Sequence, residues 1–102
     1  MLYFPYAMNA ATAIKVHVPG ALRDYCEGAS ELVLGSSNVR AALEELERRY
    51  PSLYRNVCDE TGQVRRHVNL FVNTLHVRDR EGLDTALVPG DTLTILPAIS
   101  GG

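Results

Sequence analysis

Only one stretch of this 102-residue chain has the period of an amphipathic helix, while several shorter stretches have the period of strands. Across residues 38–50, apolar side chains recur at steps of three and four residues, which is the spacing of one helix face. Ser36, Ser37 or Asn38 can cap the start of this helix, and Pro51 ends it. A single amphipathic helix cannot bury its apolar stripe alone, so we expect it to lie on one face of a sheet.

The strand-like stretches alternate apolar and polar residues, as strands do when one face is buried. Residues 13–18 and 31–34 predict a first hairpin with a long loop. Residues 67–79 predict two further strands joined at Asn73-Thr74, and a last strand begins at residue 92. The predicted inward-facing set is Ile14, Val16, Val18, Leu32, Leu34, Leu43, Leu46, Leu70, Val72, Leu93 and Ile95.

The order strand, strand, helix, strand, strand, strand predicts an α+β fold with a four- to five-stranded mixed sheet packed on one main helix. The first and last strands can pair in parallel at the centre, because the long route between them permits the crossover that parallel pairing needs. Residues 53–66 are predicted to be an irregular connection with a turn at Thr61-Gly62. Residues 81–91 are predicted to be a loop with room for a helical turn.

Charge and hydropathy argue against two classes of partner. The formal net charge is −2, and the basic residues form only short pairs such as Arg48-Arg49 and Arg65-Arg66. A nucleic-acid-binding domain usually carries a basic excess on one face. No apolar run reaches the length of a membrane span. We therefore expect partners that are neither nucleic acid nor membrane.

The first residues are apolar, but they do not fit a secretion signal. No basic residue precedes the apolar part, and Pro5 interrupts it. We expect residues 1–12 to be a poorly ordered extension, residues 13–98 to be the folded domain and residues 99–102 to be a flexible tail.

The cysteines and histidines do not predict a metal site. Cys26 and Cys58 form no CxxC motif, and the histidines lie at no ligand spacing around them. Two separated cysteines in a chain of this size fit a reducing cytoplasm, although a disulfide between them stays open. Neither cysteine has a partnered base in the sequence that would make it a nucleophile. We expect no bound metal and no bound cofactor.

The chain ends in Ser100-Gly101-Gly102, directly after a strand-like run. Glycine packs no side chain and loses the most entropy on ordering, so this pair cannot complete a core. A ββαβ…β order with a free Gly-Gly end resembles the β-grasp, ubiquitin-like proteins. "HVNLFVN", "VPGD" before the last strand and the final "SGG" are more narrowly similar to the bacterial sulfur carriers. The resemblance is greatest to the carriers of thiocarboxylate-dependent cysteine synthesis, and it spans roughly Ile14 to Gly102.

The resemblance implies a protein co-substrate that is not itself an enzyme. An E1-like adenylating enzyme would use ATP to adenylate the Gly102 carboxylate, and a sulfur donor would then displace AMP to leave a thiocarboxylate. A sulfur-accepting synthase would use this sulfur, with a PLP-dependent cysteine synthase as one candidate. Gly101 would let the tail thread into enzyme sites, and Ser100 is small enough for the same channel. Pro97 would direct the tail away from the sheet because it offers no ladder donor.

A docking surface is expected beside this tail. Strand alternation points Phe71 and Leu96 outward, and they form one apolar patch if the last strand adjoins the Phe71 strand. Arg66 and Arg78 are candidates for the rim of this patch. The alternative is that a loop or the N-terminal extension covers Phe71.

Other functions stay open on the sequence alone. The same tail would serve the small subunit of molybdopterin synthase, a carrier for thiamine or another sulfur metabolite, or a ubiquitin-like modifier that forms isopeptide bonds. A binding module whose Gly-Gly end is incidental is a further alternative. The chain has one lysine, Lys15, which disfavours the building of chains of modifiers on itself.

Overall fold

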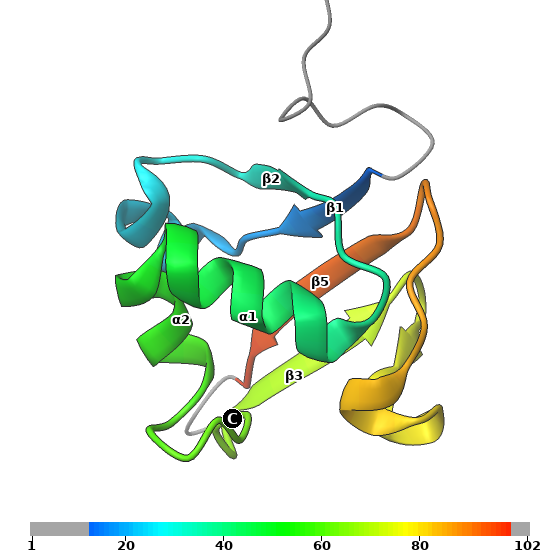
Figure 1. Ribbon diagram of the computed structural model, residues 1–102. Coiled ribbons are helices and arrows are strands. Elements are labelled where there is room, and N and C mark those ends of the chain that lie inside the picture. The colour runs from blue at the N-terminus through cyan, green and yellow to red at the C-terminus, as the bar shows by residue number, and fades with distance from the viewer. Residues whose placement is uncertain (1–12, 99–102) are drawn as a thin grey trace, which may run out of the picture.

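The computed structural model describes residues 13–98, so the N-terminal extension and the predicted tail residues Ser100, Gly101 and Gly102 lie outside the described part. Within it, strands and helices alternate much as the sequence periods predict (Figure 1). The strands are β1 (Ile14–His17), β2 (Glu31–Leu34), β3 (Val68–Val72), β4 (Leu75–His76) and β5 (Thr92–Pro97). The α-helices are α1 (Val39–Arg49) and α2 (Pro51–Val57), and the 3-10 helices are η1 (Gly20–Cys26), η2 (Val77–Asp79) and η3 (Gly82–Asp84).

The five strands form one mixed sheet in the order β2-β1-β5-β3-β4. The first and last strands, β1 and β5, pair in parallel at its centre, and the other neighbours are antiparallel. Both α1 and α2 lie on the same side of this sheet (Figure 1). This is the ubiquitin-like β-grasp arrangement, and the predicted α+β class and central parallel pair are confirmed.

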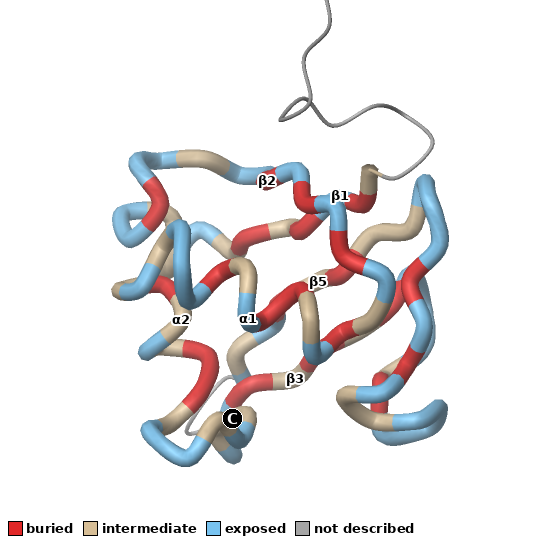
Figure 2. The backbone as a smooth tube through the Cα atoms, in the orientation of Figure 1, coloured by how far each residue is buried: buried red, intermediate tan, exposed pale blue. Residues whose placement is uncertain are grey.

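The core lies between α1 and the face of the sheet that it covers. Alternate strand residues point into this layer, so buried and exposed positions alternate along β1 and β2 (Figure 2). All eleven residues of the predicted inward-facing set are buried. Asn38 caps α1, because its Oδ1 accepts a hydrogen bond from the Ala41 N–H at 2.7 Å.

The irregular connection predicted for residues 53–66 is wrong in its first part, where α2 forms. Pro51 ends α1 but also occupies the first turn of α2, where its missing N–H leaves no partner unsatisfied. Leu53 and Val57, four residues apart, are both fully buried. Pro51 therefore separates two helices.

The "VPGD" sequence forms a tight turn that sets the direction in which β5 begins. The Asp91 N–H donates to the Val88 carbonyl at 3.0 Å, and Gly90 has φ +92°. Pro89 before a left-handed glycine is the pattern of a type II turn. The Asp91 carboxylate also accepts from the Val88 N–H at 2.9 Å and from Asn73 Nδ2 at 3.0 Å. The turn thus fastens the start of β5 to the β3–β4 hairpin.

Candidate docking face and tail base

The face of the sheet opposite α1 is the candidate docking face, and we call it the outer face. Cross-strand pairing places Phe71 opposite Thr94 on one side and opposite His76 on the other. On the neighbouring rung, Asn69 lies opposite Leu96. The outer face is thus defined by His17, Asn69, Phe71, His76, Thr94 and Leu96.

The predicted pair Phe71 and Leu96 does share this face. Because β3 and β5 adjoin, the two side chains are diagonal neighbours, within reach of each other across the ladder. Leu96 is 46% exposed, whereas Phe71 is only partly exposed. The Phe71 ring meets the His76 ring edge-on, with centroids 5.1 Å apart.

His76 contacts several groups of the outer face, and it was not predicted as a site residue from the sequence. Its Nε2 lies 2.9 Å from Asn69 Oδ1. Its Nδ1 accepts a hydrogen bond from the Arg78 backbone N–H at 3.1 Å, which caps η2. The pairing of Phe71 with His76 could have been found, because a two-residue hairpin loop at Asn73-Thr74 fixes the register.

The two predicted rim residues are both exposed. Arg66 lies two residues before β3, and Arg78 lies two residues after β4. Because β3 and β4 are antiparallel, both arginines belong to the end of the hairpin that is away from its turn. Their role in docking stays a prediction.

The base of the tail is fixed to β3. Pro97 is the last residue of β5 and lies opposite Val68, and the Ala98 N–H still donates to the His67 carbonyl. Pairing therefore continues for one residue beyond Pro97, where we had expected it to stop. Four residues follow Ala98, and fully extended they span at most about 14 Å. Gly102 can therefore lie no farther than that from Ala98.

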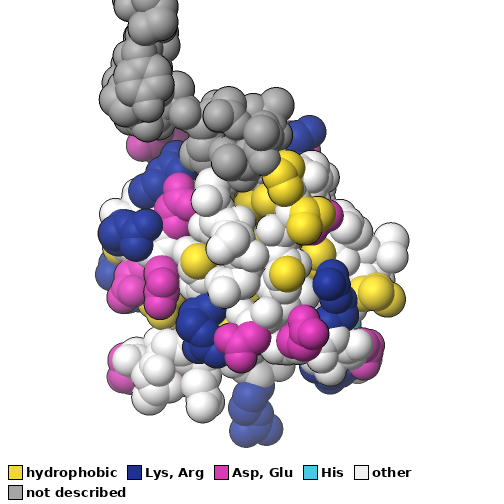
Figure 3. Space-filling view, turned by 45° about the vertical axis from the view of Figure 1, so that its right-hand side comes forward, with side chains coloured by type: hydrophobic (Ala, Val, Ile, Leu, Met, Phe, Trp, Pro, Cys, Tyr) yellow, Lys and Arg dark blue, Asp and Glu magenta, His cyan; other side chains and the backbone are white. Residues whose placement is uncertain are grey.

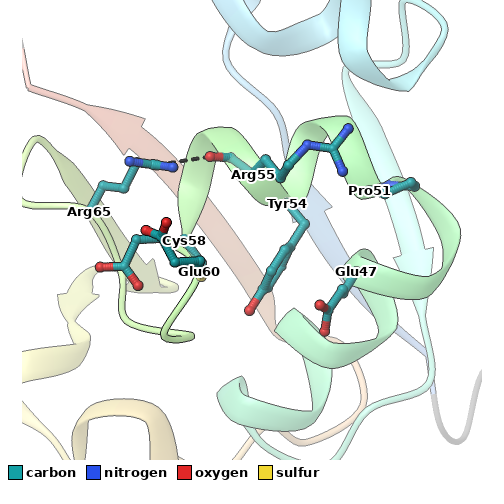
Figure 4. Close-up of a pocket in the computed structure, with 8 residues that line it drawn as sticks. Glu47, Pro51, Tyr54, Arg55, Cys58, Glu60 and Arg65 are labelled. Atoms are coloured by element: carbon teal, nitrogen blue, oxygen red, sulfur yellow. Dashed lines mark hydrogen bonds between the residues drawn. The ribbon is translucent and has the colours of Figure 1, made fainter.

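A cavity of about 580 Å³ lies elsewhere, along α2 and the loop that follows it (Figure 4). Arg55, Arg65, Glu47 and Glu60 bring both signs of charge to its lining, so it favours no single class of charged ligand. The Arg65 Nε–H donates to the Arg55 carbonyl at 2.8 Å. The Arg65 side chain, which lines one wall of the cavity, therefore also holds the loop against α2.

The cysteines are poor candidates for sulfur chemistry. Both are free and buried. Burial raises the pKa of the Cys58 thiol to about 11, against a smaller opposing effect from the Tyr54 hydrogen bond. Burial also raises the pKa of the Cys26 thiol. Both thiols therefore stay protonated at neutral pH, and the thiolate is the nucleophilic form.

One face of the described surface is mixed in charge. On the face drawn in Figure 3, Lys and Arg side chains alternate with Asp and Glu, and hydrophobic side chains gather in its upper part. Among residues 13–98, no three His, Cys, Asp or Glu side chains gather as a metal site. No helix in the same range is long and apolar enough to cross a membrane.

Comparison with known proteins decides the family. The sequence model of the ThiS family matches residues 16–102, which run from β1 through the final Gly-Gly. The chain belongs to the ThiS family. The family match therefore includes the tail residues as well as the folded domain.

Individual relatives are similar to this chain in length and fold. The sulfur carrier protein CysO of Mycobacterium tuberculosis is 34% identical over 91 residues, covering 87% of this chain and 98% of that protein. CysO in a BexX/CysO complex from Amycolatopsis orientalis superposes with a TM-score of 0.80 at 32% identity, covering 88% of this chain and 100% of that one. Small archaeal modifier protein 1 of Methanosarcina acetivorans gives a TM-score of 0.76 at 32% identity, covering 89% of this chain and 97% of that one.

Proposed function

We propose that this protein is a sulfur carrier whose Gly102 carboxylate is converted to a thiocarboxylate for use in biosynthesis, with cysteine as the first candidate product. The observation that carries the proposal is the family match, which continues through the final Gly-Gly. The similarity to CysO over nearly its whole length supports the choice of cysteine. We expect the protein to act in the cytoplasm.

The proposed chemistry has two steps. In the first step, the Gly102 carboxylate attacks the α-phosphorus of ATP on an E1-like adenylating enzyme, so that an acyl adenylate forms and pyrophosphate leaves. In the second step, a donor at the oxidation level of sulfide attacks the acyl carbon and AMP leaves. The product is a thiocarboxylate, and no oxidant or reductant is needed. ATP and the sulfur donor belong to the partner enzyme, and this chain supplies the carboxyl group.

The structure supports a division of work between the outer face and the tail. A partly apolar face with Phe71 and Leu96 gives the activating enzyme a surface to contact. Ala98, held to β3, limits how far Gly102 can reach from that surface. Gly101 and Ser100 would occupy the channel that leads to the reacting atoms. A sulfur-accepting synthase, with a PLP-dependent cysteine synthase as the candidate, would receive the same tail.

The test is an intact-mass measurement after incubation with ATP, the activating enzyme and a sulfur source. We expect the mass to rise by the difference between sulfur and oxygen, and peptide mapping to place the change at Gly102. Deletion of Gly102 should abolish loading and leave thermal stability nearly unchanged. An added alanine after Gly102 should also abolish loading, because it moves the carboxylate by about 3.5 Å.

Two outcomes would contradict the proposal. One is loading of the chain that lacks Gly102, and the other is sulfur mapped to Cys26 or Cys58 as a persulfide. The protonated state of the buried Cys58 thiol argues against the second outcome.

Protein modification is the second candidate function. The observation that favours it is the similarity to small archaeal modifier protein 1, which is nearly as great as the similarity to CysO. The two candidates differ in the product: a modifier would form isopeptide bonds between Gly102 and lysines of other proteins. Denaturing electrophoresis of the loading reaction with added protein acceptors would separate them, since only conjugates survive denaturation at higher mass.

A further inference from the structure

The strand β2 forms one edge of the sheet, because β1 is its only neighbouring strand in the described part of the chain. In an antiparallel pair, the N–H and C=O of one residue point to the same side, and this side alternates along the strand. The Ser30 carbonyl accepts from the Val18 N–H, so alternate residues beginning with Ser30 face β1. Glu31 and Val33 therefore direct their backbone groups away from the sheet. Such an edge can pair with a further strand.

A side chain of α1 occupies this edge. The Arg49 Nη1 donates to the Val33 carbonyl at 3.1 Å. The same nitrogen lies 2.8 Å from Glu45 Oε2, and the guanidinium carbon lies 5.5 Å from the centroid of the Tyr50 ring. Arg49 is thus held by three groups of its own domain, and it covers a carbonyl that a further strand would need for pairing.

Glu45 fixes the place of this arginine. Its other oxygen, Oε1, accepts a hydrogen bond from Ser36 Oγ at 2.9 Å and one from the Gly35 N–H at 3.3 Å. The Glu45 side chain is only 15% exposed, whereas the Arg49 side chain is 42% exposed. A carboxylate held by the β2–α1 connection in this way positions the guanidinium on the edge of β2.

The outward groups of β2 fit a second copy of the same strand. If two copies meet antiparallel about Leu32, Glu31 of each copy lies opposite Val33 of the other, so no like charges face each other. All outward groups of both residues are then paired, and the contact is isologous, so it closes at two copies. The other edge strand, β4, has only two residues and offers less of an edge. A four-residue strand buries less than the roughly 1,000 Å² of a stable interface, so the pair is weak.

We propose that the edge of β2 is a pairing surface for a second copy of this chain and that Arg49 keeps this surface closed. The inference goes beyond the proposed function, because it holds with or without sulfur on the tail. Pairing requires each copy to give up its hydrogen bond from Arg49 to Val33, and one such bond corresponds to about fivefold in an equilibrium constant. Because both copies give up one bond, removal of the arginine should raise the dimerisation constant by about 25-fold.

The test compares Arg49→Met with Arg48→Met in the full chain by sedimentation velocity, from micromolar to millimolar concentration. Both changes remove one positive charge from the end of α1, and methionine keeps the helix preference of arginine. Arg48 is exposed, and the hydrogen bond to Val33 comes from Arg49. We expect Arg49→Met to form dimers within this range, at concentrations about 25 times lower than wild type requires. Arg48→Met should behave as wild type, and urea denaturation checks that both variants are folded.

Amide hydrogen exchange locates the contact. The Glu31 and Val33 amides should exchange fast in the wild-type monomer and become protected in the Arg49→Met dimer. Addition of Val33→Pro to Arg49→Met should restore the monomer, because proline removes an outward N–H and leaves the pairing of β2 with β1 in place. Arg49→Ala should dimerise like Arg49→Met, which shows that the methionine side chain is not the cause.

Three results would overturn the inference. The first is a folded Arg49→Met or Arg49→Ala chain that stays monomeric at millimolar concentration. The second is a dimer that persists with Val33→Pro or protects amides outside β2, since the copies would then meet elsewhere. The third is equal dimerisation of Arg48→Met, since the lost charge and not the open edge would then be the cause. Loading of sulfur at Gly102 is measured by mass on the wild-type chain and enters none of these outcomes.

Discussion

Replacement of Phe71 by Asp tests both the fold and the docking face. From the sequence alone, an exposed Phe71 predicts a change in stability within about 0.5 kcal/mol. The structure raises this figure, because Phe71 is half-buried and meets the His76 ring. An edge-to-face pair contributes about 0.5–1.5 kcal/mol, and the difference in strand preference adds up to about 1 kcal/mol. We therefore expect Phe71→Asp to lower the free energy of unfolding by about 2 kcal/mol.

A loss of this size leaves a domain of ordinary stability folded, since such domains unfold at a cost of about 5–15 kcal/mol. Urea denaturation followed by circular dichroism measures the loss, and an unchanged dependence on urea shows that the folded state is intact. Binding to the activating enzyme is then measured well below the transition. We expect binding to be strongly weakened, because a desolvated carboxylate would replace a ring at the contact.

Val33→Asp is the matched control. Val33 is 45% exposed and lies on the same side of the sheet as Phe71, but on the edge strand β2, which β1 and β5 separate from β3. Its register partner is Lys15, whose positive charge lies beside the new carboxylate. We expect its stability to fall by up to about 1 kcal/mol, from the lower strand preference of Asp, and its enzyme affinity to stay near wild type. If Phe71→Asp does not fold, Phe71 belongs to the core and the reasoning on docking is refuted. If it folds and binds as tightly as both wild type and Val33→Asp, the enzyme does not contact Phe71.

Three further predictions concern the scaffold. Asn38→Ala removes the cap of α1 and should lower the free energy of unfolding in urea by about 1 kcal/mol, whereas Asn38→Asp should retain it. Leu53→Ala should cost about 2–5 kcal/mol in the same measurement, because it opens a cavity under α2. For Cys58, the unfolded chain releases the thiol proton near pH 9 and the folded chain near pH 11, so this thiol stabilises the fold below pH 9 and the contribution is lost between the two values. Urea curves from pH 8 to 11 should therefore show wild type losing stability relative to Cys58→Ala, and parallel curves would contradict the raised pKa.

The sheet and α1 could be predicted because their periods are long and clear. Four or more alternating residues in β1 and β5 fix which side chains point inward, and Asn38 with Pro51 marks both ends of α1. The helix α2 was not predicted, because only two of its seven residues, Leu53 and Val57, are buried apolar positions. Two positions are too few to define a period, and the burial of α2 is decided by its packing rather than by its sequence.

The candidate site could be predicted only in part. Strand alternation placed Phe71 and Leu96 on one face, and the pairing of β3 with β5 brings them together. The half-burial of Phe71 depends on His76, whose ring orientation is set by hydrogen bonds to Asn69 and to the Arg78 backbone. Such hydrogen bonds form between groups that become neighbours only in the folded chain, so no periodic pattern in the sequence predicts them.

The position of β5 in the middle of the sheet has a consequence for how the protein is made. Pairing of β1 with β5 joins Val16 to Leu93, residues separated by most of the chain. A nascent chain that stops before residue 92 lacks the strand on which both β1 and β3 pair, so it leaves two open edges and no continuous sheet. The domain can therefore close only after synthesis has passed Pro97, the last residue of β5. A folded copy therefore always contains β5, and chains broken off before this strand stay unfolded and open to proteolysis.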